Sequence, residues 1–325
     1  QSERQRRPAN GRRRWRRSRA PAVIMGHAMG NQTMSNRWMR GAAALLFTLA
    51  LPCVAGTQKT FASPEAAAEA LVDGIARQDD AELRTVLGSG HQRLIPFDDI
   101  SAEDRIAFLE AWARGHRIKR VSDSDARLEL DGGWTLPIPI VRTRAGWSFD
   151  IRAGREEMRT RRIGRNELAA IQSMYAYVEA QQEYAAQDRN GDGVVEYAQK
   201  VLSSPGARDG LYWPTAAGDP ESPLGPLFDT KNLKDGYNGY RFRILKAQGP
   251  AARDGARSYV RDGRMTDGYA LVAWPARYDE TGVMTFIVSQ DGVVYEKHLG
   301  PDTATIAGAM TRFDPDASWT ALPAP

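Results

Sequence analysis

The chain has 325 residues, with 44 basic and 40 acidic side chains and a formal net charge of +4. The positive charge lies at one end, because residues 1–56 hold 11 Lys or Arg and one acidic residue, Glu3. The remaining residues hold 33 basic and 39 acidic side chains, a net charge of −6. Nucleic-acid binding depends on clustered Lys and Arg that neutralise phosphates, so this acidic balance argues against a nucleic-acid partner.

Residues 34–56 have the three parts of a secretory signal peptide. A cationic segment from Met34, Met-Ser-Asn-Arg-Trp-Met-Arg, leads into an apolar run at residues 41–51 and then into Pro-Cys-Val-Ala-Gly. The run has 11 residues, whereas a membrane-spanning helix needs roughly 20. We expect cleavage after Ala55 or Gly56, export to the periplasm, and no transmembrane segment in the mature chain.

Residues 1–33 precede this leader and carry nine arginines within the first nineteen positions. Such an arm is typical of binding to nucleic acid or anionic lipid. A signal peptide works poorly inside a chain, so we expect translation to start at Met34 and the arm to be absent from the mature protein. Cys53, the single cysteine, would leave with the leader. Lipid attachment at Cys53 is the less favoured alternative, because Pro52 stands where a lipoprotein signal needs a small residue.

Helical signals open the mature chain, in a predicted N-terminal domain at residues 57–155. Ser63 can cap a first helix that begins at Pro64, because a serine hydroxyl accepts hydrogen bonds from free backbone N–H groups. Further helices are predicted at residues 80–87 and 102–113. A period of two then indicates short antiparallel strands, at residues 127–130, 134–141 and 147–151. We therefore expect helices packed on a small antiparallel meander.

A second predicted domain, residues 156–325, starts with a long helix and continues as an antiparallel sheet. Apolar residues at helical spacing place the helix at residues 166–187, with Asn166 as its cap. Alternating segments predict strands at residues 240–247, 268–274, 283–289 and 293–298. Residues 251–267 are polar and predicted to form an exposed excursion. The whole pattern indicates the α+β class.

A basic run lies just upstream of the predicted long helix. It consists of Arg155, Arg159, Arg161, Arg162 and Arg165. We expect a solvated face or salt bridges to nearby acidic residues, with an anion-binding site as the alternative.

The segment after the long helix resembles the first half of a calcium-binding loop, with oxygen donors at positions 1, 3 and 5 and a glycine at position 6. The candidate calcium ligands are Asp188, Asn190, Asp192, the Val194 carbonyl and Glu196. Position 12 departs from the pattern, because Gln199 replaces the bidentate glutamate. The alternative is an exposed Asx-type turn without an ion. A bound calcium would brace the loop.

Aromatic residues from two loop segments and one strand form a candidate groove for a sugar or peptide. They are Tyr212, Trp213, Tyr237, Tyr240 and Trp274. Satellite core packing is the alternative interpretation. The histidines of the mature chain, His91, His116 and His298, follow no metal-binding spacing, so we expect them to be structural or surface residues.

Recognisable catalytic motifs are absent from the sequence: no GxSxG elbow, no phosphate loop and no GxGxxG after a strand occurs. Carboxylates are abundant, but nothing selects a catalytic pair. The sequence therefore predicts a non-enzymatic protein that binds an unidentified ligand or envelope partner. A periplasmic carboxylate-dependent hydrolase is the alternative.

Several blocks of the mature chain resemble one known family. They include Gly210-Leu-Tyr-Trp-Pro, Gly239-Tyr-Arg-Phe-Arg-Ile-Leu and Gly268-Tyr-Ala-Leu-Val-Ala-Trp-Pro. Together they are similar to the bacterial exported proteins called domain of unknown function 2950, over about residues 57–320. The resemblance implies export from a Gram-negative cell, and the family carries no established activity or catalytic residues.

A second likeness concerns only the C-terminal half. A long helix, an acidic glycine turn and strands ending in a Gln-Asp-Gly hairpin are similar to the globular part of type II secretion pseudopilins. That likeness implies that a loop can hold calcium. The chain departs from pseudopilins because an α+β region, in place of an exposed apolar helix, precedes the long helix.

Overall fold

The computed structural model describes residues 58–88, 90–93, 101–189, 191–215, 220–225 and 236–323. The leader, the arginine arm and Cys53 lie outside the described residues, so the predictions about them stay predictions. The described part is α+β, as predicted, with two hydrophobic cores. None of its helices is long and apolar enough to span a bilayer.

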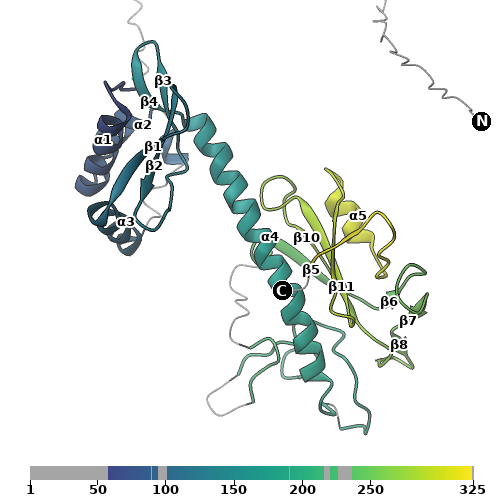
Figure 1. Ribbon diagram of the computed structural model, residues 1–325. Helices are drawn as coiled ribbons and strands as arrows, with labels where there is room; N and C mark the ends of the chain where they lie inside the picture. The colour runs from purple at the N-terminus through teal and green to yellow at the C-terminus, as the bar shows by residue number, and fades with distance from the viewer. Residues whose placement is uncertain are drawn as a thin grey trace, which may run out of the picture. The chain divides into compact units, whose positions relative to one another are not determined.

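Three α-helices form the first part of the fold (Figure 1). They are α1 (Pro64–Arg77), α2 (Asp80–Leu87) and α3 (Ala102–Arg114), with a short 3-10 turn at His91–Arg93 between the last two. The Ser63 hydroxyl accepts a hydrogen bond from the Ala66 N–H at 3.1 Å, which confirms the predicted cap of the first helix. All three predicted helices are therefore confirmed.

A four-stranded antiparallel sheet follows, in the order β1-β2-β3-β4. Its strands are β1 (His116–Arg120), β2 (Asp125–Leu130), β3 (Ile140–Thr143) and β4 (Gly146–Phe149). Leu128 and Ile140 of the sheet pack against Leu71 of α1 in the first core, and all three are fully buried. The predicted meander is confirmed, but its middle strand β3 begins at Ile140, near the end of the strand predicted at residues 134–141. The sequence analysis missed β1, because its exposed polar residues leave only Ile118 partly buried.

The long helix α4 (Ile151–Tyr184) begins well before the predicted start at residue 166. Asp150 is its cap, with Oδ1 accepting from the Ala153 N–H at 2.9 Å. Asn166 is not a cap; its side-chain amide donates to the Thr281 carbonyl at 2.8 Å. The start was wrong because the first half of α4 buries little besides Gly154 and shows no apolar period.

Two arginines of the basic run in that first half, Arg159 and Arg161, form ion pairs, as expected. Arg159 pairs with Glu156 and Asp279, and Arg161 pairs with Glu157 at 2.7 Å. Residues of α4 pack in both cores, so the helix runs through the predicted boundary at residues 155 and 156.

The second sheet has five strands in the order β13-β12-β11-β10-β5. They are β5 (Tyr240–Leu245), β10 (Ala270–Pro275), β11 (Met284–Ser289), β12 (Val294–His298) and β13 (Thr320–Ala321). In Figure 1, α4 and α5 (Thr303–Ala309) lie on different sides of this sheet. The predicted strands are confirmed, and β5 is an edge strand.

The excursion predicted at residues 251–267 is only partly exposed. Two small sheets form there, from β6 (Ala247–Gln248) with β7 (Arg257–Ser258) and from β8 (Val260–Arg261) with β9 (Arg264–Met265). Tyr259 and Met265 are fully buried in the second core. The polar composition hid these two anchors, which fold the segment back onto the protein.

Candidate ligand-binding site

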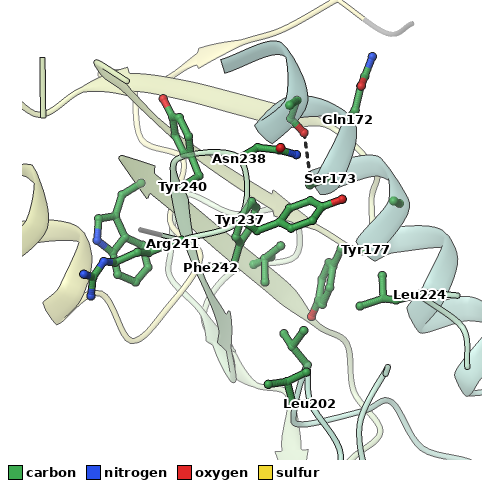
Figure 2. A pocket seen from close by; sticks show the side chains of 16 residues that line it. Gln172, Ser173, Tyr177, Leu202, Leu224, Tyr237, Asn238, Tyr240, Arg241 and Phe242 are labelled. Carbon is green, nitrogen blue, oxygen red and sulfur yellow. Dashed lines mark hydrogen bonds between the residues drawn. The ribbon is translucent and has the colours of Figure 1, made fainter. Parts of the chain in front are cut away.

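A cavity of about 650 Å³ lies between α4 and β5 (Figure 2). Tyr177 of α4 and Leu271 of β10 are buried residues of its wall, and Leu202 is an exposed one. Gln172 and Asn238 add exposed amide groups. A largely apolar space with a few polar groups at its rim, of this size, is typical of small-molecule sites.

Three of the five predicted groove residues, Tyr237, Tyr240 and Trp274, line this cavity. The other two do not: Trp213 is buried nearby in the core, and its indole N–H donates to the Pro220 carbonyl at 3.3 Å. Tyr212 supports the cavity wall through its backbone, since its N–H donates to the Val201 carbonyl at 2.8 Å. Ligand binding in this groove stays a prediction.

A tight turn places Tyr237 and Asn238 at the cavity. Tyr237 and Tyr240 exchange backbone hydrogen bonds of 2.8 and 3.0 Å around Asn238 and Gly239. Both central residues have positive φ, 50° and 75°, as in the Asn-Gly turns that favour hairpins. A Cβ at Gly239 would lie 2.5 Å from the side-chain nitrogen of Asn166, so only glycine fits against α4.

Two tyrosine hydroxyls in the cavity wall are already engaged in hydrogen bonds. The Tyr177 hydroxyl donates to the Ala270 carbonyl at 3.2 Å, and the Tyr240 hydroxyl donates to the Met284 carbonyl at 2.9 Å. Burial raises the pKa of both groups far above the usual tyrosine value. Both side chains are therefore neutral wall groups rather than bases.

Charge at the cavity is positive. Among the described lining residues, Arg241 is the only charged one. It forms no ion pair or hydrogen bond with the described part of the chain. Because none of these lining residues is Asp or Glu, the predicted carboxylate-dependent hydrolase gains no support here.

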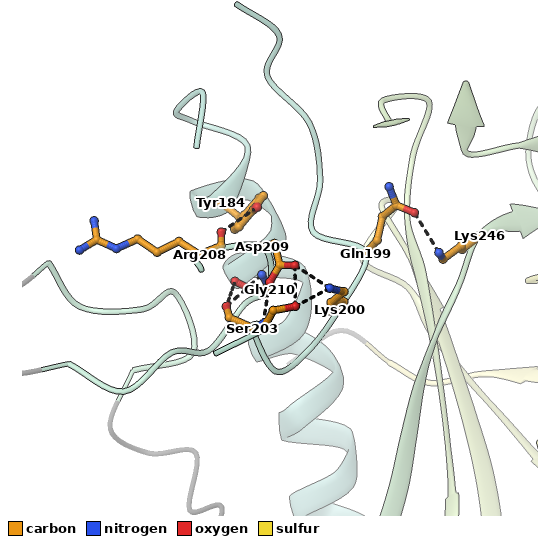
Figure 3. A network of polar contacts seen from close by, with 9 residues as sticks. Tyr184, Gln199, Lys200, Ser203, Arg208, Asp209, Gly210 and Lys246 are labelled. Atoms are coloured by element: carbon orange, nitrogen blue, oxygen red, sulfur yellow. Dashed lines mark hydrogen bonds and ion pairs between the residues drawn. The ribbon is translucent and has the colours of Figure 1, made fainter. Parts of the chain in front are cut away.

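A polar network lies beside the part of the cavity wall that Val201 and Leu202 form (Figure 3). Lys200 and the Ser204 hydroxyl both donate to Asp209 Oδ2, at 2.5 and 2.9 Å, and the Ser204 N–H donates to Oδ1 at 2.7 Å. These bonds, that from Lys200 first, lower the pKa of Asp209 to about 2. The network closes the loop next to Val201 and Leu202, which line the cavity.

The helix residues of the site were missed by sequence reasoning. Ala169, Ser173 and Ala176 of α4 line the cavity. Their small side chains recur at helical spacing on one face, which is the signal that points to an open space against the neighbouring strand.

The predicted calcium loop folds as a turn with internal partners. Asp188 accepts the Gly191 and Gly193 N–H groups, each at 2.8 Å. Asp192 Oδ2 accepts two hydrogen bonds from Arg264 of β9, at 3.0 and 2.7 Å. Within the described residues, no group of three or more acidic, histidine or cysteine side chains is arranged to hold a metal.

The other predicted loop positions provide no further evidence for a calcium site among the described residues. Asn190 lies outside the described residues, and Val194 and Glu196 are partly buried. Gln199 turns to the neighbouring hairpin, where its amide donates to the Gly263 carbonyl at 2.7 Å. Calcium binding therefore stays a prediction, in competition with the Arg264 guanidinium.

Each of the three histidines lies in its own local contact. His91 is buried with Nε2 3.1 Å from Asp80 Oδ1, and His116 stacks on the Trp112 ring. His298 lies 2.7 Å from the Tyr278 hydroxyl. The contact of His91 is therefore a buried structural one, and those of His116 and His298 lie at the surface.

The family model described as Protein of unknown function (DUF2950) matches residues 58–322. The chain belongs to this family. The match covers both cores and every residue of the cavity wall in this DUF2950 chain. No curated protein and no solved structure matches the chain. The likeness to pseudopilins stays a prediction.

Proposed function

We propose that this DUF2950 chain is an exported periplasmic or envelope protein that binds a ligand between α4 and β5 without catalysing a reaction there. The cavity is the observation that supports it most. Its apolar wall of Tyr177, Phe242 and Leu271 offers burial to a ligand, and Gln172 and Asn238 offer hydrogen bonds at the rim.

Export is supported by the leader pattern at residues 34–56. The test is fractionation of cells expressing the full chain, with mass spectrometry of the purified N-terminus. We expect a periplasmic protein that starts after Ala55 or Gly56. A cytoplasmic protein that retains residues 1–33 would contradict the export proposal.

Ligand binding is tested by filling the cavity from its helix side. Ala176 is exposed and lines the cavity, so Ala176→Trp occupies the space without removing a core contact. Glu179→Trp is the matched control, since Glu179 is exposed on the same helix but does not line the cavity.

The probe for this test is N-phenyl-1-naphthylamine, whose fluorescence rises in apolar sites. We expect saturable binding to the wild type and to Glu179→Trp, and binding weakened about tenfold or more in Ala176→Trp, equivalent to at least about 1.4 kcal/mol. Equal titrations for the two variants would show that the probe binds elsewhere and would remove the cavity as the site.

A further inference from the structure

The outer edge of β5 has no strand beside it in the described part of the chain. β5 ends the five-stranded sheet, with β10 on its inner side. Tyr240 at its start bonds Tyr237 in the turn, and Lys246 just after its end accepts the Tyr259 N–H at 2.9 Å. Between these covered ends the edge is open.

The open backbone groups belong to Phe242 and Ile244. Gly239 accepts the Ala276 N–H at 2.9 Å, so odd-numbered residues of β5 direct their backbone groups toward β10. Even-numbered residues direct theirs outward, as Tyr240 and Lys246 show. Neither Phe242 nor Ile244 has a backbone partner on that side among the described residues. Such unpaired N–H and C=O groups are a template for another strand.

The cavity reaches this open edge. Tyr240, Arg241 and Phe242 are consecutive, and all three line it. Alternate side chains of a strand point to opposite faces, so three consecutive lining residues place the strand backbone at the cavity. Figure 2 shows Arg241 pointing away from Tyr177, as this alternation requires.

We propose that the ligand is an extended peptide segment that adds to the outer edge of β5 as a further strand and inserts an apolar side chain into the cavity. This inference rests on the proposed ligand-binding function and names its ligand class. Main-chain hydrogen bonds to Phe242 and Ile244 provide affinity, and the cavity selects the side chain.

The arginines of β5 indicate which side chains the peptide carries on its other face. Directly opposite residues of paired strands share a face, so peptide residues facing Phe242 and Ile244 lie on the cavity side and are apolar. The residues on either side of the one that faces Phe242 lie on the face of Arg241 and Arg243. Arg243 already donates to carbonyls at the end of α5, at 2.5 and 3.0 Å, whereas Arg241 has no described partner. An acidic peptide residue therefore pairs with Arg241.

The probe is the synthetic peptide acetyl-Thr-Val-Asp-Phe-Asp-Val-Thr-amide, which alternates apolar and acidic residues. A second peptide has the same side chains but carries N-methyl groups on Phe and the preceding Val, the residues that face Phe242 and Ile244 when an antiparallel addition places the second Asp opposite Arg241. A third replaces both Asp by Lys. Binding to purified mature protein is measured by calorimetry, with N-phenyl-1-naphthylamine titrated in parallel.

We expect the parent peptide to bind and to displace the fluorescent probe, and N-methylation to weaken binding about tenfold through loss of two hydrogen bonds. Arg241→Glu is expected to weaken the Asp peptide and strengthen the Lys peptide severalfold. Arg144→Glu is the matched control, because Arg144 is exposed in a distant turn of the first sheet. It is expected to change neither titration.

The two proposals fail separately in this experiment. If the fluorescent probe binds at the cavity but the peptides do not, or if the N-methylated peptide binds equally well, the peptide inference is overturned and the binding function stands. If Ala176→Trp changes no titration, both are overturned.

Other occupants of the edge give their own results. Concentration-dependent dimers in sedimentation that Arg241→Glu abolishes identify a second copy and overturn the peptide proposal. Peptide binding that appears only after residues 226–235 are replaced by Gly and Ser identifies the chain's own segment and overturns it too.

Discussion

Two edge strands of this protein, β4 in the first sheet and β5 in the second, differ in what lies along their outer edges. In the first sheet, Phe61 covers the outer edge of β4 through two backbone hydrogen bonds with Trp147, each 2.8 Å long. In the second sheet, the outer edge of β5 is open at Phe242 and Ile244 among the described residues. An uncovered edge carries a risk of unwanted pairing, so proteins normally cover it. The β4 edge is therefore closed within the fold, whereas the β5 edge lies open beside the cavity, where the proposed ligand would bind.

The closed edge depends on a very close approach. Gly146 has a φ of 132°, and a Cβ there would lie 2.7 Å from the Phe61 carbonyl oxygen. In the described part of the chain, no backbone hydrogen bond fixes a neighbouring segment at the outer edge of Phe242. The closed edge is therefore built into the local backbone, whereas the open edge can accept a partner.

The largest expected effect comes from breaking the closed edge with Gly146→Val. The new side chain meets both a backbone clash and a disfavoured φ, so we expect the free energy of unfolding to fall by about 2–4 kcal/mol. Urea denaturation followed by circular dichroism measures it. Gly132→Ala is the control, because Gly132 has a φ of 84° with no atom within 4 Å of a Cβ. A loss as large in the control would assign the effect to φ alone.

Alkaline pH is expected to break the second core before the first. All 11 tyrosines lie at or after Tyr175, and burial raises the pKa of Tyr259 and Tyr269 to about 12 from a usual 10.0. Their folded pKa exceeds the unfolded one, so the stability they contribute is full below pH 10 and is lost as pH rises toward 12.

Urea denaturation at pH 8 and pH 11 tests this difference in a background in which Trp213, Trp274 and Trp319 of the second core are replaced by Phe. The remaining tryptophan fluorescence then reports the first core, through Trp147, and tyrosinate absorbance reports the second. We expect the second core to unfold at lower urea at pH 11. The double variant Tyr259→Phe and Tyr269→Phe should lose less stability between the two pH values. Identical pH dependence in wild type and variant would exclude these hydroxyls as the cause.

Local signals predicted the fold better than long-range contacts did. Ser63 and Pro64 define the start of α1 from neighbouring residues alone, and the strands of the second sheet show a clear period. The start of α4 was missed because its first half is exposed and lacks a buried stripe. Tyr259 was hidden for the opposite reason, since one buried anchor in a polar segment makes no pattern.

The candidate site shows the same division. Aromatic residues such as Tyr237 and Tyr240 mark it in the sequence, because they stand close together around the Asn-Gly turn that leads into β5. The helix side of the cavity, including Ala176, is marked in the sequence only by small side chains at helical spacing. Its role as a cavity wall becomes apparent only once β5 is placed beside α4. The open backbone of Phe242 depends on which strands pair, which a single sequence does not reveal.

A smaller effect is expected from the network that holds the cavity wall. Asp209 has a folded pKa of about 2 against a usual 3.8, so its contribution is present above pH 4 and lost as pH falls toward 2. Because the pair with Lys200 is partly exposed, Asp209→Asn is expected to cost about 1 kcal/mol or less. Melting temperatures at pH 7 and pH 2.5 measure it, and the difference between wild type and variant should shrink at the lower pH.

The same variant tests whether the network also positions the cavity wall. If the network only stabilises, Asp209→Asn binds N-phenyl-1-naphthylamine as the wild type does. If it positions Val201 and Leu202 at the cavity, affinity falls although the protein stays folded. Asp73→Asn is a suitable control, because its pair with Arg77 is exposed on α1. This helix packs in the first core and contributes no residue to the cavity wall.

Calcium gives the smallest expected effect. Arg264 donates two hydrogen bonds to Asp192, so a calcium ion at this loop must displace an internal cation. Arg264→Ala removes that competitor. We expect it to bind calcium up to about fivefold more tightly than the wild type, because an exposed ion pair contributes at most about 1 kcal/mol. Calorimetry on chelator-treated protein measures the difference.

The control is Arg261→Ala, which removes the same charge from the same hairpin but breaks a pair with Asp267 instead. A gain in Arg264→Ala alone places calcium at Asp192, whereas equal gains in both variants would reflect general charge. No calcium heat in any variant would leave Arg264 as the permanent counterion of this loop. In that case the acidic loop holds β8 and β9 against the second core by an ion pair, and the structural role assigned to a metal belongs to an arginine.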